Sequence, residues 1–205
     1  MRRLGILLSG RGSNFEAIAR NVRSGALDAE IAVVISNRAE APGLALARQL
    51  GLPARHIPSK GLEREAYDAL LIEALRGHGV ELVILAGYMR LLSPAFVRAF
   101  PMRILNIHPS LLPAFPGLDA QHQAFEYGAK ITGCTAHFVD EQLDHGPVIR
   151  QAAVAVLPGD TAETLSARIL EREHEIYSEA IRIVLSGRYR IEGRRVVTED
   201  GINVA

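Results

Sequence analysis

The sequence predicts an α/β protein with a doubly wound, mostly parallel open sheet and antiparallel additions in its C-terminal half. Two observations carry this prediction. In the first half, short apolar runs alternate with segments whose apolar residues recur every three or four positions, which is the rhythm of βαβ units. In the second half, two apolar runs are joined by a short loop containing Gly146 and Pro147, which favours antiparallel pairing.

The elements of the first half follow from apolar spacing and from the residues that end each segment. Leu4–Leu8 is a short apolar run ending in Ser-Gly, and it indicates a buried strand. Residues 14–24 carry Phe15, Ile18 and Val22 on one helical face and are closed by a glycine. We expect further strands at 31–35, 54–57, 82–86 and 103–107, and further helices at 42–51, 63–76 and 94–100.

The second half begins with an extended loop that is rich in proline. The hairpin expected near the end of the chain has Glu192 and Gly193 as its turn residues. No stretch indicates a linker, a repeat or a low-complexity segment, so we expect a single domain over residues 1–205. The expected elements are helices at 119–127 and 161–186, strands at 131–139 and 148–156, and the small hairpin at 188–197.

Composition limits the classes of function. Lys plus Arg and Asp plus Glu both number 23, so no overall field attracts nucleic acid or an anionic membrane, and we expect neither as a partner. No apolar run approaches the ~18 residues that span a bilayer. The single cysteine, Cys134, excludes an internal disulfide and a cysteine-based zinc site, which fits a reducing cytoplasm. Arg11 and Glu16 interrupt the resemblance of the N-terminus to a signal peptide.

The segment Ser9–Asn14 lies between the first expected strand and helix, where glycines allow backbone N–H groups to approach an anion. It is not a Walker loop, because it lacks the lysine. It is not a dinucleotide fingerprint, because Phe15 replaces the third glycine and Asn37 stands where an acid is expected. A phosphate-monoester site and a merely tight strand-to-helix turn both remain open.

Asn106 and His108 form a second candidate site. They are two residues apart, so they share a face if the strand continues to position 108. The C-terminal end of a parallel strand is where open α/β sheets bind ligands. An amide beside an imidazole suits an oxyanion, since one donor is neutral and the other can carry charge. The alternative is that Asn106 caps a turn and His108 is a buried structural histidine.

Asp144 lies in the loop before Gly146 and Pro147. An aspartate near His108 would favour the imidazolium form, which is the form that an oxyanion requires. Taken alone, the segment is most simply an ordinary turn.

Two other chemistries are disfavoured. His108, His137, Asp144 and His145 could supply three ligands to zinc, but no closely spaced ligand pair is present, so we expect no metal. Thiol catalysis is disfavoured because Cys134 and His137 are an odd number of residues apart and point to opposite faces of a regular strand.

Together these motifs resemble the folate-dependent formyltransferases, and the Ser-Gly-x-Gly-Ser-Asn loop narrows the resemblance to the glycinamide ribonucleotide branch. Ala114 stands where some members carry a basic residue, and residues 119–122 stand where others are rich in histidine. The matching segments follow the family order over nearly the whole chain: Leu8–Asn14, Ser36-Asn37, Arg64–Tyr67, Leu85–Ser93, Asn106–Pro113, Phe115–Gly117, His137–Asp140, Leu143–Ile149 and Glu173-His174.

The resemblance implies a role for each matching residue. The implied organisation is one formyltransferase domain, with a phosphate-binding, Rossmann-like half at about 1–100 and a folate-binding, catalytic half at about 101–205. The implied catalytic residues are Asn106, His108 and Asp144. The implied substrate-binding residues are Gly12, Ser13 and Asn14 for the phosphate and Glu173 for the ribose. The implied folate-binding residues are Arg64, Met89, Arg90, Leu91, Leu92, Asn106, Val139 and Asp140.

The implied reaction moves the formyl group of 10-formyltetrahydrofolate, a co-substrate, to the amine of 5-phosphoribosylglycinamide in de novo purine (IMP) biosynthesis. It proceeds by direct attack, without metal, in a cytoplasmic monomer or homodimer. Three alternatives stay open. Methionyl-tRNA formyltransferase carries an added C-terminal module, and formyltetrahydrofolate hydrolase carries an added N-terminal domain. A non-catalytic module that binds folate or nucleotide would not need Asn106, His108 and Asp144.

Overall fold

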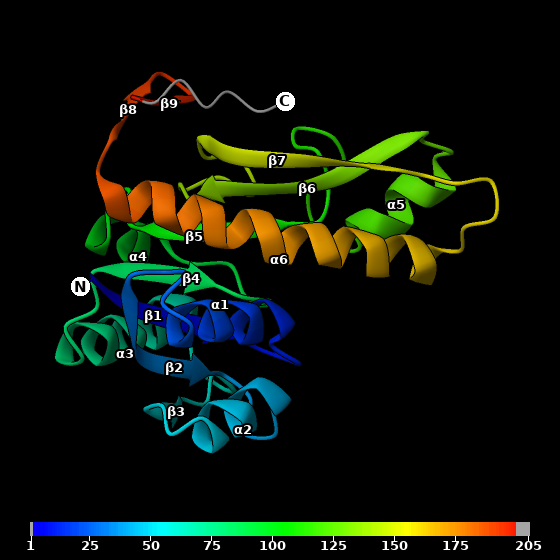
Figure 1. The fold of residues 1–205 in the computed structure, drawn as a ribbon. Coiled ribbons are helices and arrows are strands. Elements are labelled where there is room, and N and C mark those ends of the chain that lie inside the picture. Colours follow the sequence, from blue (N-terminus) through cyan, green and yellow to red (C-terminus); the bar gives the residue numbers. More distant parts are fainter. Residues whose placement is uncertain (1, 200–205) are drawn as a thin grey trace. The chain divides into compact units, whose positions relative to one another are not determined.

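The computed structural model describes residues 2–199 of the chain. The chain separates into two compact units whose boundary lies between Leu105 and Asn106. Strand β5 (Ile104–His108) contains this boundary. Figure 1 labels the elements of both units. The single domain expected over 1–205 stays a prediction.

The first unit has a parallel sheet with the strand order β3-β2-β1-β4. Strand β1 pairs in parallel with both neighbours, and Leu7 lies opposite Ile35 on one side and Leu85 on the other. Parallel strands are covered on both faces, which explains why these runs are almost wholly apolar. The bounds are β1 (Arg2–Leu8), β2 (Ala29–Ser36), β3 (Ala54–His56) and β4 (Leu82–Leu85).

Four helices accompany these strands, and local sequence fixes where they begin. Pro42 occupies the first turn of its helix, where its missing N–H costs nothing. Ser93 caps another helix, because its Oγ accepts a hydrogen bond from the backbone N of Phe96 at 3.2 Å. The side chains of Phe15, Tyr67 and Phe96 are fully buried in the core. The bounds are α1 (Ser13–Arg23), α2 (Pro42–Gln49), α3 (Arg64–Gly77) and α4 (Pro94–Ala99).

The second unit adds antiparallel pairing. Strands β6 (Ile131–Phe138) and β7 (Val148–Ala155) pair antiparallel, and β7 pairs in parallel with β9 (Arg195–Thr198). Strand β8 (Tyr189–Glu192) completes the order β6-β7-β9-β8 as the antiparallel partner of β9. The predicted α/β class, parallel first and with antiparallel additions later, is confirmed.

Helix α6 (Ala162–Ser186) lies along β6 and β7, whereas α5 (Ala120–Glu126) is short (Figure 1). A capping box at Thr161 starts α6, and Gly187 ends it in the left-handed conformation. Glu173 belongs to the buried face of this helix, in the same stripe as Leu165, Ile169, Ile176 and Tyr177.

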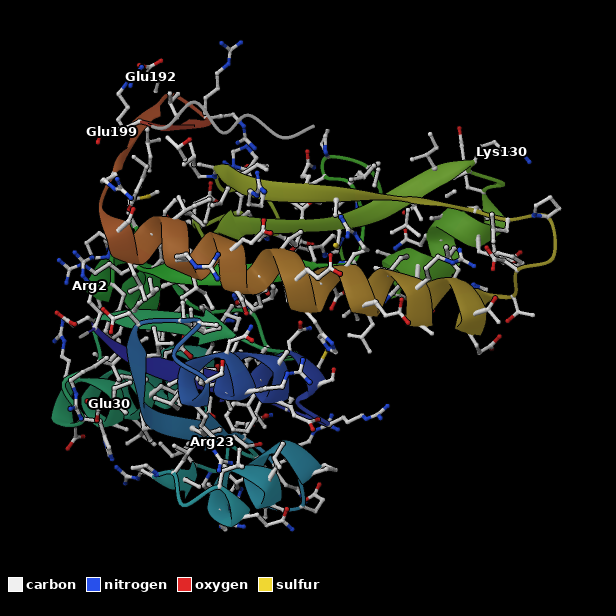
Figure 2. The ribbon with its side chains drawn as sticks, in the orientation of Figure 1. Arg2, Arg23, Glu30, Lys130, Glu192 and Glu199 are labelled. Carbon is white, nitrogen blue, oxygen red and sulfur yellow. The ribbon has the colours of Figure 1, made fainter. Side chains whose placement is uncertain are left out.

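One turn differs from the expectation. The hairpin turn is Gly193–Arg194, because Glu192 still pairs with Arg195, and Gly193 adopts a φ of 63°. Figure 2 shows Glu192 and Glu199 at this hairpin and Lys130 beside the start of β6. None of the helices between residues 2 and 199 combines the length and apolarity that crossing a bilayer requires.

Candidate active site

Strand β5 presents two polar side chains on one face. It runs through His108, as the shared-face prediction required, so Asn106 and His108 alternate with the buried Ile107. His108 is 4% exposed, although it is the last residue of its strand. A buried polar ring needs polar partners, and each ring nitrogen of His108 lies near an oxygen.

The two ring nitrogens of His108 each face an oxygen. Nε2 donates to the carbonyl oxygen of Phe115 at 2.8 Å, and Nδ1 lies 3.4 Å from Oδ2 of Asp144. Both oxygens are acceptors, so the imidazole is set between two groups that can receive an N–H donor.

Asp144 is held by backbone geometry as well as by charge. Its φ is 49°, a left-handed conformation that aspartate tolerates better than most residues. Its Oδ2 accepts a hydrogen bond from the backbone N of Gly117 at 2.8 Å, and its side chain is 8% exposed. The carboxylate is therefore fixed beside His108.

His137 is a neutral neighbour of this pair. Its Nδ1 donates to the carbonyl oxygen of Phe138 at 2.7 Å, and its Nε2 accepts from the side-chain amide of Asn106 at 3.2 Å. Burial is the largest of several influences on the pKa of His137, and it lowers that pKa below its ordinary value. The Nε2 of His137 lies 4.0 Å from Oδ1 of Asp144. Its register with β7 shifts at Ala136/His137, and such irregularities often accompany functional sites.

No role was predicted for the residues that shape the loop after His108. The carbonyl oxygen of Phe115 faces His108 because Phe115 adopts a φ of 51°, and the backbone N of Gly117 reaches Asp144. Ser110 donates from Oγ to the carbonyl oxygen of Ala114 at 2.5 Å, which draws the loop back toward the strand end. No side-chain pattern predicts these backbone contacts.

Thr135 anchors the same loop from β6. Its Oγ1 donates to the carbonyl oxygen of Ser110 at 2.7 Å and accepts from the backbone N of Leu112 at 3.1 Å. Thr135 is fully buried and lies two residues before His137, on the same face of β6. The spacing of two residues between Thr135 and His137 is the feature of the sequence that could have indicated a role for Thr135 at this site.

The loop that carries Asp144 is closed by a network of polar side chains. The Nδ1 of His145 lies 2.8 Å from Oδ2 of Asp140, and the backbone N of Gln142 donates to Oδ1 of Asp140 at 2.9 Å. Arg194, in the hairpin turn, donates to the carbonyl oxygen of His145 and to its Nε2, which leaves Nδ1 to donate to Asp140. The predicted folate residues Val139 and Asp140 are both half-buried at the start of this loop.

In the first unit, the loop after β1 is a backbone-lined turn. Gly12 precedes α1 with a φ of 75°, and its carbonyl oxygen accepts from the backbone N of Glu16 at 2.9 Å. The backbone N of Gly43 donates to the carbonyl oxygen of Gly10 at 3.1 Å. A Cβ on Gly12 would lie 3.0 Å from Cα of Gly43. The backbone N–H groups in the first turn of α1, an 11-residue helix, therefore point toward a turn in which Gly10 and Gly12 have no side chain.

The predicted site residues fall into two groups, one in each unit. Arg64 is exposed at the start of α3, and segment 89–92 follows β4. The first unit holds Gly12, Ser13, Asn14, Arg64, Met89, Arg90, Leu91 and Leu92, and the second holds Asn106, His108, Val139, Asp140, Asp144 and Glu173.

Cys134 belongs to the core. It is fully buried, and burial, aided by the charge of Glu173, raises its pKa to about 12. A thiol in this environment stays protonated, which favours the interpretation of Cys134 as a small core residue. Between residues 2 and 199, no three His, Cys, Asp or Glu side chains gather as a metal-binding group.

Comparison with known proteins identifies the class of this chain. The family model described as formyl transferase matches residues 2–181, and the chain belongs to that family. The crystal structure of glycinamide ribonucleotide transformylase 1 from Symbiobacterium toebii superposes with a TM-score of 0.95 at 56% identity, covering 97% of this chain and 94% of that one. This likeness confirms the predicted fold.

Two curated relatives narrow the resemblance. The phosphoribosylglycinamide formyltransferase of Escherichia coli (strain K12) is 43% identical over 187 residues, which cover 91% of this chain and 88% of that protein. The trifunctional purine biosynthetic protein adenosine-3 of Drosophila pseudoobscura pseudoobscura is 47% identical over 192 residues, covering 92% of this chain and 14% of that protein. The chain spans between 14% and 20% of the length of four such trifunctional relatives.

Proposed function

We propose that this protein transfers the formyl group of 10-formyltetrahydrofolate to the amine of 5-phosphoribosylglycinamide, a step of purine biosynthesis. The observation that carries the proposal is the buried imidazole of His108, set between the carboxylate of Asp144 and the carbonyl oxygen of Phe115. The similarity to phosphoribosylglycinamide formyltransferases supports this choice of substrates.

The binding roles divide between the substrates. In the proposal, the backbone around Gly12, Ser13 and Asn14 receives the phosphate at the start of α1, and Glu173 accepts hydrogen bonds from the ribose hydroxyls. The absence of side chains at Gly10 and Gly12, in the turn before the N-terminus of α1, supports the phosphate assignment.

The folate is assigned to two segments whose residues are exposed or half-buried. Segment 89–92 and residues Val139 and Asp140 bind the pterin, and Asn106 contributes an amide donor. Arg64 and Arg90 attract the carboxylates of the glutamate tail. The exposed apolar side chains of Met89 and Leu91 support a role for this segment in ligand binding.

The reaction we propose needs no covalent enzyme intermediate. The amine nitrogen of the substrate forms a bond to the formyl carbon, and the carbonyl oxygen becomes an oxyanion. Collapse of this tetrahedral species breaks the bond to N10 of the folate. The amine loses a proton and N10 gains one, and Asp144 relays that proton through a water molecule. Holding both substrates together supplies much of the acceleration.

The proposed oxyanion site uses Asn106 and His108. One N–H of the Asn106 amide is committed to His137, which leaves the other for the oxyanion. The Nε2–H of His108 points at the carbonyl oxygen of Phe115, so in the proposal the oxyanion replaces that carbonyl as acceptor. Asp144 keeps the ring charged during this exchange.

The test is a reconstitution with purified protein. Incubation with 10-formyltetrahydrofolate and 5-phosphoribosylglycinamide is expected to yield the formylated amide and tetrahydrofolate, followed by absorbance and mass spectrometry. Formate release at the same rate without 5-phosphoribosylglycinamide would instead identify a hydrolase. Binding of both compounds without turnover would identify a non-catalytic module.

A further inference from the structure

An exposed stretch of the first unit is held at both ends by buried side chains. Met89 is 62% exposed and Leu91 is 53% exposed, and no helix or strand contains either residue. Ser9 and Asp68, which accept hydrogen bonds from the backbone of this stretch, are each 2% exposed. The fixed points therefore lie in the core, and the segment between them faces outward.

Ser9 holds the first end. Its Oγ accepts a hydrogen bond from the backbone N of Met89 at 2.9 Å and donates to Oδ1 of Asn37 at 2.7 Å. A hydroxyl has one proton, and because Asn37 takes it, a lone pair of Oγ is left for Met89. The backbone N of Ser9 also donates to the carbonyl oxygen of Gly87 at 3.0 Å.

Asp68 holds the second end. Its Oδ2 accepts from the backbone N of Ser93 at 2.6 Å, a short bond of the kind that a carboxylate makes. The adjacent Tyr67 lies under the guanidinium of Arg90, 5.0 Å from ring centroid to Cζ, and Arg90 donates to Oγ of Ser59 at 3.3 Å. Two neighbouring residues of α3 thus fix the segment at positions 90 and 93.

We propose that Ser9 and Asp68 are positioning residues that hold segment 89–92 in the conformation that receives the folate. The inference rests on the proposed function, in which backbone groups of this segment bind the pterin. Backbone amides recognise a flat heterocycle only when their directions are fixed, and ordering a free segment on binding would cost conformational entropy. Because Ser9 and Asp68 hold the segment in the folded protein, its ordering occurs during folding and not on ligand binding.

The decisive variant is Asp68→Ala, measured in the full-length protein. We expect the KM for 10-formyltetrahydrofolate to rise about tenfold or more, the effect of losing one hydrogen bond to a charged group. The kcat and the KM for 5-phosphoribosylglycinamide should change by no more than about threefold, because neither depends on this segment. Asp68→Asn should restore most of the folate KM, since its amide oxygen still accepts from Ser93.

Ser93→Ala is the matched control. It removes the hydroxyl that caps α4 but leaves the backbone N–H that Asp68 accepts. Its loss of stability should be about 1 kcal/mol, typical of a lost cap. Its folate KM should stay near the wild-type value. Should Asp68→Ala fail to fold, Ser9→Ala releases the other end and is expected to raise the folate KM. Only the folate KM is compared for this variant, because Ser9 also begins the turn assigned to the phosphate.

Hydrogen exchange of the ligand-free protein gives a readout without turnover. Protection of the Ser93 amide should fall in Asp68→Ala and persist in Ser93→Ala. Lost protection with an unchanged folate KM would overturn the positioning role, as would equal increases in both KM values or a folate defect in Ser93→Ala. Failure of the proposed function is distinct, because the wild-type protein itself would then transfer no formyl group.

Discussion

The side-chain amide of Asn106 donates a hydrogen bond to Nε2 of His137, 3.2 Å away. The other ring nitrogen donates to the carbonyl oxygen of Phe138 at 2.7 Å. The ring therefore carries its proton on Nδ1 and is neutral. Protonating Nε2 would turn an N–H toward the amide donor, so the hydrogen bond that orients Asn106 depends on His137 remaining neutral.

The first prediction is that His137 makes stability depend on pH. Burial lowers the pKa of His137 below its ordinary 6.5. Under mildly acidic conditions this histidine therefore binds a proton in the unfolded chain but not in the folded chain. Its contribution is complete above pH 6.5 and declines as the pH falls from there toward the lowered pKa. His137→Gln should flatten this decline, which urea unfolding between about pH 5 and 8 would measure.

The comparison is between slopes, since other groups titrate in both proteins. A glutamine in place of His137 has an amide oxygen that can still accept from Asn106, so the variant should fold. Parallel stability curves for the two proteins would show that His137 does not carry the pH dependence.

Much of the fold could be predicted because the local signals agree with one another. Apolar runs mark the buried strands, and glycine or proline marks helix ends, as at Pro42 and Gly187. The predicted turn of the C-terminal hairpin lies one residue too early in the sequence. Glu192 and Arg195 are both polar and exposed, so the alternation of apolar and polar residues does not fix where the turn begins.

The site was predictable where side chains carry the signal. Asn106 and His108 follow from spacing two on a strand, and the structure places Asp144 beside His108. The carbonyl oxygen of Phe115 was not predictable. Its direction depends on a positive φ of 51°, and a phenylalanine in the sequence does not predict that conformation. Backbone acceptors of this kind emerge only from the folded loop.

The second prediction concerns the turn before α1. Gly12→Val should weaken the binding of 5-phosphoribosylglycinamide while leaving folate affinity nearly unchanged, because a side chain there blocks the approach of an anion to the backbone. Titration of each ligand by calorimetry would measure the two affinities. An equal loss of both, with the fold intact, would contradict the phosphate assignment.

Gly25→Val is the control for backbone strain. Gly25 follows the same helix with a φ of 77° and has open space around it, whereas Gly12 has a φ of 75° and faces Gly43. Both variants should lose roughly 1–2 kcal/mol of stability from the left-handed conformation, and Gly12→Val should lose more because its side chain also crowds Gly43. Only Gly12→Val should lose substrate affinity.

The third prediction is that catalysis survives exhaustive chelation. In the proposed mechanism, the amide of Asn106 and the charged ring of His108 stabilise the oxyanion, which is the task that a Lewis acid would otherwise perform. Turnover after prolonged dialysis against a chelator should equal that of the untreated protein. Loss of activity that added zinc restores would favour a metal held by His108, His137 and Asp144.

The fourth prediction tests the charge of Asp144. Asp144→Asn keeps the size of the side chain and suits the left-handed φ of 49°, since asparagine also tolerates that conformation. Its amide oxygen can still accept from Gly117, so folding should change little. Removing the charge beside His108 should lower turnover by ~10² or more, while both substrates bind within a few-fold of the wild-type affinity.

Asp119→Asn is the matched control, because Asp119 is an exposed aspartate of the same unit with a φ of 58°. It undergoes the same chemical change in the same backbone conformation, and its turnover should stay near the wild-type value. Near-normal turnover of Asp144→Asn would mean that the carboxylate only closes the loop. The proton would then have to travel from the amine to N10 through solvent, because His137 is committed to Asn106 and Phe138.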